Sequence, residues 1–194
     1  MKNNFNKRIF TPVSLLRNLA DVAGVLPTTP ALFTSGRVSP AFRERLFLTV
    51  TSVNKCRYCT WMHTDIAQAA GVSDEQINAL LDSAPDTGLE EEKPALLYAL
   101  HFAQTSRNPD ASQTAELKRI YGEEKAADII AFLQLIFFAN LSGNTFDAFL
   151  SRLEGKPADA GNAVFEGAFA LLSGPVLLAI RAIYGKNEAL TGAH

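Results

Sequence analysis

The spacing of apolar side chains is the feature that most limits the fold of this chain. Apolar residues recur every three to four positions, as in amphipathic helices, and no run shows the two-residue alternation of a strand bounded by hairpin turns. The pattern predicts an all-α helical bundle in which one face of each helix supplies the core. With 194 residues, 47% of them hydrophobic, the chain is long enough for one domain with a substantial core.

Prolines, glycines and capping residues set the expected boundaries of the helices. Pro27 and Pro30 predict an irregular passage after the first helix, and Ser39-Pro40 predicts the start of the next. Asn54 is the expected N-cap of the helix that follows, although residues 40–70 also fit one long bent helix. The expected helices cover residues 14–24, 40–53, 54–70, 89–106, 110–121, 123–153 and 159–184. One more helix is expected after a capping box at Ser73, and Gly174-Pro175 is expected to interrupt the last helix.

Charge and hydropathy limit the partners of the protein. The net charge is −2 and no basic stripe is present, which argues against nucleic acid. The apolar segments 126–141 and 163–183 both contain charged residues, so we expect buried or subunit-interface helices rather than membrane spans. Together they exceed what one small bundle readily hides, which predicts a homo-oligomer. The N-terminus makes a poor signal peptide, and we expect a cytoplasmic protein.

The chain contains two cysteines, Cys56 and Cys59, and His63 follows them. Two residues spaced i, i+3 on a helix have Cα atoms about 5 Å apart, within the range of about 4.4–6.8 Å that a disulfide requires. His63 lies one turn beyond Cys59 and is expected within hydrogen-bonding reach of its thiol. With Asn54 as the cap, Cys56 would occupy the second helical position, where the helix dipole favours its thiolate. The spacing predicts a redox site, with a cysteine pair suited to a reducing compartment.

Structural zinc is the alternative chemistry for a Cys-x2-Cys pair. Zinc normally takes four ligands, and the chain has no second Cys-x2-Cys and no His-x3-His. The other candidate ligands are His63, Glu44, His101 and His194. We therefore expect no metal and no other cofactor at this site.

Glu44, Cys56, Cys59 and His63 together read Glu-x11-Cys-x2-Cys-x3-His. By spacing alone Glu44 is a solvated residue on an amphipathic helix. The combined pattern, strongest over residues 40–82, resembles the alkylhydroperoxidase-D-like branch of the carboxymuconolactone decarboxylase superfamily. The resemblance implies an all-α domain, here residues 39–194 after an N-terminal extension of residues 1–38, that assembles into trimers or hexamers.

The resemblance also implies a function and a role for each residue. It implies a thiol-dependent peroxidase or disulfide oxidoreductase that reduces hydroperoxides through the Cys56–Cys59 pair. Cys59 would attack the peroxide and Cys56 would resolve the product, whereas dipole reasoning alone makes Cys56 the nucleophile. His63 would relay the proton of Cys59 to Glu44, directly or through water. A dithiol, a thioredoxin-like protein or a lipoylated protein would reduce the pair.

Other residues have a second interpretation beside a functional one. Tyr58, Trp61 and Met62 would wall a pocket for an apolar hydroperoxide, but ordinary packing is the more common use of such residues. Tyr58 stands where well-known members of the branch have a histidine. Asn140 and Asn144 would face the site or a subunit interface.

Two alternative functions remain open at this point. One is a redox-sensing or zinc-stabilised interaction protein. The other is a lactone decarboxylase, against which the cysteine pair argues, because such members of the superfamily generally lack it.

Overall fold

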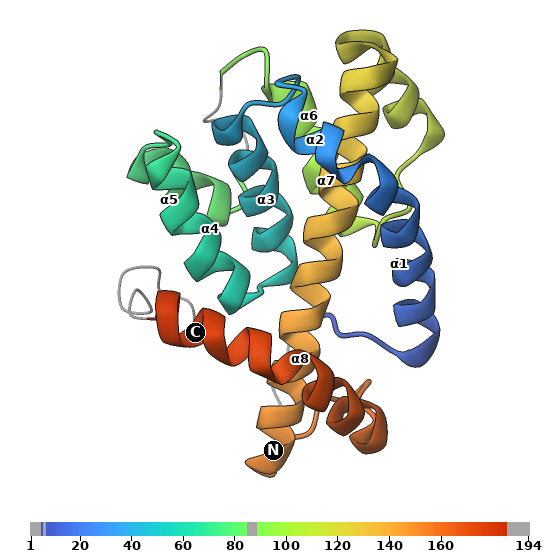
Figure 1. The fold of residues 1–194 in the computed structure, drawn as a ribbon, viewed down its shortest axis with the longest axis vertical. Helices are drawn as coiled ribbons and strands as arrows, with labels where there is room; N and C mark the ends of the chain where they lie inside the picture. The colour runs from blue at the N-terminus through green and yellow to red at the C-terminus, as the bar shows by residue number, and fades with distance from the viewer. Residues whose placement is uncertain (1–4, 6, 85–88, 186–194) are drawn as a thin grey trace.

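The computed structural model describes residues 5, 7–84 and 89–185 (Figure 1). These residues form helices and contain no β-strand, which confirms the all-α prediction. In chain order the elements are α1 (Pro12–Val25), the 3-10 helix η1 (Leu26–Thr28), α2 (Thr29–Thr34), α3 (Pro40–Asn54), α4 (Arg57–Ala69), α5 (Asp74–Leu81), α6 (Lys93–Gln104), α7 (Ala111–Leu153) and α8 (Ala163–Tyr184).

Side chains cap several of these helices as their sequences predict. Ser39 accepts a hydrogen bond from the backbone N–H of Phe42 at 3.2 Å, with Pro40 in the first turn of α3. Ser73 likewise accepts from the backbone N–H of Gln76 at 3.3 Å, at the start of α5. Each cap satisfies a backbone donor that has no partner within the helix.

Three predicted interruptions are wrong or only local. The passage through Pro27 and Pro30 is helical, because each proline lies in the first turn of η1 or α2, where no N–H is needed. The break at Gly122 is a kink within α7, with φ 76° and ψ 164°. Pro175 lies inside α8 without ending it. Prolines and glycines mark these positions correctly but do not decide whether the chain continues in the same direction.

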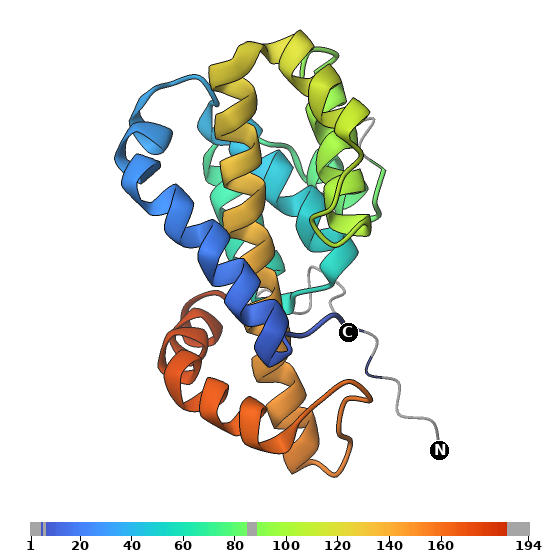
Figure 2. The ribbon, with the colours of Figure 1, turned by 90° about the vertical axis from the view of Figure 1, so that its right-hand side faces the viewer.

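Helix α7 is the centre of the fold. It packs against α1, α3, α4, α6 and α8. In Figure 2, α1 runs along one side of α7 and α6 along the other, while α8 crosses its C-terminal part. The apolar core lies between these helices and includes large buried side chains from α7 such as Ile129, Phe132 and Leu133.

The N-terminal segment packs into this same core. Phe10 is 1% exposed, contacts the rings of Phe138 and Phe169, and donates its backbone N–H to Thr145 Oγ1 at 2.9 Å. Leu32 on α2 is also buried in the core. The described part of residues 1–38 therefore shares its packing with the helices that follow.

Helix α8 is held at its start but leaves much apolar surface uncovered. Its buried Glu166 accepts two hydrogen bonds from Arg152 at the end of α7, at 2.7 and 3.0 Å. Large exposed side chains then follow along α8: Val164, Leu171, Leu172, Val176, Leu178 and Ile183. Two helices of the described part, α7 and α8, are long and apolar enough to cross a membrane by length and composition alone. Half of the most apolar stretch of α7 is buried, as in a core helix, whereas most of that of α8 is not.

Candidate active site

The cysteine pair lies at a sharp junction between α3 and α4. Asn54 is the last residue of α3, and Lys55 adopts a left-handed conformation with φ 56°. Cys56 is then the N-cap of α4, and its sulfur accepts the backbone N–H of Cys59 at 3.4 Å. The prediction that Asn54 caps this helix is wrong, and so is the alternative of one bent helix over residues 40–70. Lys55 reverses the chain direction instead, at a position where the sequence offers no glycine.

The two sulfur atoms are adjacent. The Cys56 thiol donates to Cys59 Sγ at a distance of 2.8 Å between the sulfurs, and both cysteines are free. Cys56 is 0% exposed and Cys59 is 4% exposed. Burial, and the neighbouring Cys59 sulfur, raise the pKa of the Cys56 thiol well above its ordinary value. The expectation that the helix dipole favours a Cys56 thiolate is therefore wrong, because desolvation outweighs the dipole at this buried cap.

Glu44 and His63 form a buried pair beside the thiols. Glu44 on α3 is buried, and its Oε2 lies 2.7 Å from Nδ1 of the His63 ring on α4. Its other oxygen accepts from Arg43 at 2.9 Å, and Phe47 packs edge-on against the imidazole. The solvated-surface interpretation of Glu44 is wrong, because the helix turns this carboxylate inward. Nδ1 is thus occupied, and Nε2 is the ring nitrogen left for proton transfer.

The predicted hydrogen bond between His63 and Cys59 is absent from the interactions recorded for the described residues. The His63 ring contacts Glu44 and Phe47, whereas the Cys59 thiol contacts Cys56. Cys59 and His63 thus lie one turn apart on α4 with different partners, Cys56 for the thiol and Glu44 on α3 for the imidazole.

Helix α7 supplies residues that hold the α3–α4 junction. Asn144 donates to the backbone carbonyl of Asn54 at 2.7 Å, and Asn140 accepts from the Asn54 side chain at 3.2 Å. Gly143, between them, lies against Cys56: a Cβ at this glycine would come within 2.6 Å of the cysteine sulfur. The two asparagines therefore act within this chain rather than across an interface. Gly143 was missed, since a lone glycine in a long helix gives no sign of what it faces.

Asp147, one turn after Gly143, holds the two residues between the cysteines. Its carboxylate accepts from the hydroxyl of Tyr58 at 2.9 Å and pairs with Arg57 at 2.6 Å. Lys7 pairs with its second oxygen at 2.8 Å. Asp147 is buried, and sequence reasoning missed it because its partners are far away along the chain. Burial, followed by the negative charge of Asp147, raises the pKa of Tyr58.

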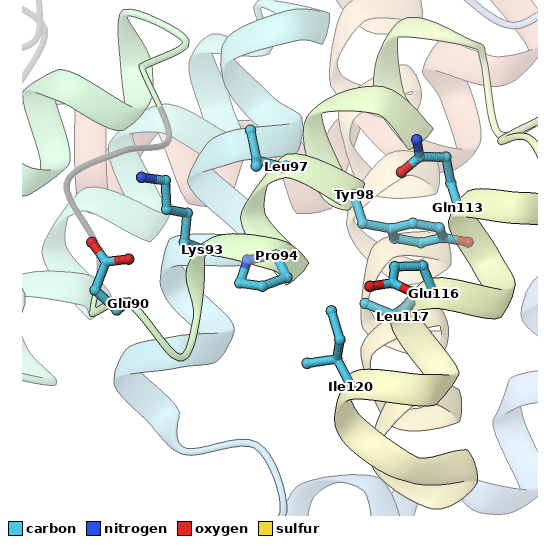
Figure 3. Close-up of a pocket in the computed structure, with 9 residues that line it drawn as sticks. All are labelled: Glu90, Lys93, Pro94, Leu97, Tyr98, Gln113, Glu116, Leu117 and Ile120. Atoms are coloured by element: carbon cyan, nitrogen blue, oxygen red, sulfur yellow. The ribbon is translucent and has the colours of Figure 1, made fainter.

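The predicted pocket residues take different positions. Tyr58 and Trp61 are buried and pack edge to face, with ring centroids 5.5 Å apart, while Met62 is partly buried. None of the three lines either of two cavities in the structure. A cleft of about 380 Å³ lies between α6 and the first turns of α7 (Figure 3). A second cavity of about 570 Å³ lies beside α1 and α7.

Of the candidate zinc ligands, Glu44 and His63 lie near the thiols but are paired with each other. Within the described ranges, no group of three or more His, Cys, Asp or Glu side chains is placed to hold a metal ion. His101 lies on α6, 3.4 Å from Asp110 and away from the pair. His194 lies outside the described residues.

Comparison with known proteins bears on the first half of the chain. Residues 27–104 match the model of the carboxymuconolactone decarboxylase family. This match supports the superfamily. It spans Glu44, Cys56, Cys59 and His63, and it does not distinguish the alkylhydroperoxidase-D-like branch. No curated protein and no solved structure matches the chain.

Proposed function

We propose that this protein is a thiol-dependent peroxidase or disulfide oxidoreductase. The observation that carries the proposal is the 2.8 Å separation of the Cys56 and Cys59 sulfurs, beside a Glu44–His63 pair joined at 2.7 Å. When a peroxide oxidises such a pair of thiols to a disulfide, the sulfurs need to move only a short way, to about 2.05 Å apart. The superfamily match is consistent with an enzyme, because the superfamily contains both decarboxylases and peroxidases.

The two cysteines are suited to different roles. Cys56 is fully buried and remains a protonated thiol. Its S–H donates a hydrogen bond to the Cys59 sulfur. Cys59 receives that hydrogen bond and lies one turn before His63, so we assign peroxide attack to Cys59 and resolution to Cys56. His63 takes the proton of Cys59 through Nε2, directly or through water. Glu44 holds the ring in place and stabilises the imidazolium that forms.

The cycle balances without a metal or another cofactor. The Cys59 thiolate attacks the O–O bond of a hydroperoxide, and the imidazolium of His63 protonates the departing oxygen, giving an alcohol and Cys59 sulfenic acid. The Cys56 thiol then condenses with the sulfenic acid, releasing water and forming the disulfide. An external dithiol reduces this disulfide by two exchange steps and is itself oxidised to a disulfide.

Burial of the pair limits what can reach it. A peroxide is small, whereas a thioredoxin-like or lipoylated protein reductant must contact the disulfide directly. We therefore propose that reduction requires local opening of the α3–α4 junction, and that a small dithiol or a lipoyl group on a flexible arm is the better reductant. The proposed setting is the reducing cytoplasm.

Turnover measurements test the proposal. Consumption of cumene hydroperoxide is followed with excess dihydrolipoamide as the dithiol. We expect wild-type turnover, its loss in Cys59→Ser, and in Cys56→Ser a single turnover that leaves a sulfenic acid on Cys59, detected with dimedone. Thr60→Ser, which keeps the hydroxyl that donates to the Cys56 carbonyl and removes only a buried methyl group, is the matched control and keeps turnover. Full turnover by Cys59→Ser would refute the assignment.

A redox-sensing protein is the second candidate, and the burial of both thiols favours it. A sensor oxidises once and is reduced slowly, because a protein reductant has little access. The same assay separates the two functions. Many equivalents of peroxide consumed per protein indicate an enzyme, whereas a stoichiometric burst that stops at the disulfide indicates a sensor.

We also propose that the protein is a homo-oligomer. The apolar side chains exposed along α8 form more uncovered surface than a monomer usually carries. Exposed apolar residues on α1, among them Val13 and Leu16, form further uncovered apolar surface away from α8.

A further inference from the structure

The larger of the two cavities has a volume of about 570 Å³, and neither the cysteine pair nor the Glu44–His63 pair lines it. It lies between the N-terminal segment, α1, the turn after α6 and α7. None of the described residues that line it is acidic, and four are basic. The lining residues are Lys7, Arg8, Ile9, Thr11, Ser14, Arg17, Asn18, Ser106, Arg107, Phe137, Leu141 and Ala160.

Two of the four basic residues form no ion pair with a carboxylate of the described residues. Lys7 pairs with Asp147, and Arg107 pairs with Asp21. Arg8 instead donates to the backbone carbonyls of Ala103 and Gln104. Those oxygens are neutral, so no described residue supplies a negative charge to balance Arg8.

Arg17 is exposed on α1, and no ion pair is recorded for it within the described part of the chain. Counting the described residues, the cavity thus has two positive charges, on Arg8 and Arg17, that no neighbouring carboxylate neutralises. A guanidinium offers several N–H donors in a fixed plane, which suits the oxygens of a carboxylate or a phosphate.

The floor of the cavity is apolar. Phe137 and Leu141, one turn apart on α7, are both buried beneath it. Arg107 lies over the Phe137 ring, with 5.9 Å between its guanidinium carbon and the ring centroid. A cavity with cations at its rim and an apolar floor fits a ligand with one charged end and one apolar end.

We propose that this cavity binds a small amphipathic anion, in which a carboxylate or phosphate head meets Arg8 and Arg17 and an apolar chain covers Phe137 and Leu141. The backbone of the turn is consistent with a ligand site: Ser106 and Arg107 both adopt positive φ, at 56° and 69°. Such conformations cost energy for residues other than glycine, and they are common at ligand sites.

The site adjoins the candidate active site without being part of it. Arg8 Nη1 lies 3.4 Å from the Asn54 side chain, and Asn144 donates to the backbone carbonyls of both Arg8 and Asn54. Asn54 is two residues before Cys56. The proposal gives the N-terminal segment a binding role, and it does not rest on the peroxidase cycle.

Calorimetric titration of the full chain tests the proposal with four probes: octanoate, octyl phosphate, octan-1-ol and inorganic phosphate. We expect octanoate, octyl phosphate or both to bind at least about tenfold more tightly than octan-1-ol and inorganic phosphate, because only they supply both ends. The head group that binds more tightly distinguishes a carboxylate ligand from a phosphate ligand. Binding should weaken as salt rises, since the contacts are partly exposed.

Variants locate the binding. Arg17→Gln should lower the affinity for the more tightly bound probe by about tenfold, which is the effect of losing one charge-assisted hydrogen bond. Arg17 is exposed, so this variant should fold, and an unchanged unfolding midpoint confirms that it does. Arg119→Gln removes an exposed arginine elsewhere on α7 and should leave binding unchanged. The proposal would be overturned if octan-1-ol bound as tightly as the better of the two anionic amphiphiles, if neither anionic amphiphile bound, or if the two variants lost equal affinity.

Discussion

At the scale of single residues, Gly143 determines how closely α7 approaches the cysteine pair. Its missing side chain leaves room for Cys56 Sγ and for the Tyr58 ring, 2.6 and 3.0 Å from where a Cβ would lie. Real Cβ atoms do not come so close to a sulfur, so any side chain at this position displaces Cys56. The alignment of the two sulfurs thus depends on a residue 87 positions away from the cysteine that it contacts.

We predict that Gly143→Ala slows formation of the Cys56–Cys59 disulfide by about tenfold to a hundredfold, because a displacement near 1 Å costs that much in a reaction that depends on alignment. Stopped-flow oxidation by hydroperoxide measures the rate. Gly24→Ala is the matched control: it lies inside α1 with nothing within 4 Å of the added methyl, and it should leave the rate unchanged. Equal rates in the two variants would show that Gly143 does not position the sulfur.

The buried Cys56 thiol links stability to pH. Its pKa is raised by burial in the folded protein, whereas in the unfolded chain it ionises near the ordinary value of 9.0. The folded state therefore keeps a proton that the unfolded state loses. This contribution to stability is complete below about pH 8 and is lost as the pH rises past 9, by at most about 1.4 kcal/mol per pH unit.

We predict that the free energy of unfolding of the reduced protein falls between pH 8 and about pH 10, and that Cys56→Ser falls less steeply because serine does not ionise. Urea denaturation at a series of pH values measures both. The raised pKa of Tyr58 acts in the same direction at higher pH and is common to both proteins. Parallel curves would mean that Cys56 is not desolvated in the folded state.

At the scale of the elements, the α3–α4 junction shows what local sequence can and cannot predict. The spacing of Cys56, Cys59 and His63 predicts one helix for all three, and the structure places Cys59 and His63 on α4 with Cys56 as its N-cap. Glu44, which the Glu-x11-Cys-x2-Cys-x3-His pattern groups with them, meets His63 from α3. The N-cap was assigned to Asn54 because asparagine is a good capping residue. The structure uses Asn54 elsewhere, bound by Asn140 and Asn144 of α7, and this tertiary contact outweighs the local preference.

Helix α8 is the element whose surface requires most explanation. Leu171 and Leu172 are 82% and 83% exposed on adjacent positions, next to further apolar side chains. The sequence predicted an apolar helix there, but not whether its apolar side would face the core of its own chain. The structure buries Glu166, Ala170, Gly174 and Leu177, packs Phe165, Phe169, Ile180 and Tyr184 partly against the core, and leaves most of the other side chains of α8 exposed.

We predict that Leu172→Glu dissociates the oligomer, because a charge at a buried interface is costly to desolvate. Size-exclusion chromatography with light scattering at micromolar concentration gives the mass. Leu97→Glu is the control, since Leu97 is 49% exposed on α6 and away from α8. A wild-type protein that is monomeric at this concentration would refute the oligomer proposal.

At the scale of the whole molecule, α7 contributes both to the apolar core and to the contacts that hold the candidate active site. It supplies the core residues Phe132 and Leu133, the asparagines that bind the α3–α4 junction, and Asp147, which holds Arg57 and Tyr58. The all-α class was predictable because it follows from helical periodicity within each segment. The contacts made by α7 were not, because one sequence does not show which distant residues meet.

The N-terminal segment gives a further test of the whole molecule. The sequence set residues 1–38 apart as an extension, because the recognised pattern begins after them, yet Phe10 lies in the core. We predict that Phe10→Ala lowers the free energy of unfolding by about 3–5 kcal/mol, whereas Phe33→Ala, at a ring that is 50% exposed, costs much less. Urea denaturation compares them. A small effect of Phe10→Ala would indicate an extension that folds apart from the core.

The central claim is that Cys56 and Cys59 form a reversible redox pair. Mass spectrometry of the reduced protein after one equivalent of cumene hydroperoxide tests it most directly. We expect loss of the mass of two hydrogens, a disulfide mapped between residues 56 and 59, and full recovery of both thiols with dihydrolipoamide. Two thiols that remain titratable, or oxidation of one cysteine to sulfinic acid without a disulfide, would contradict the claim.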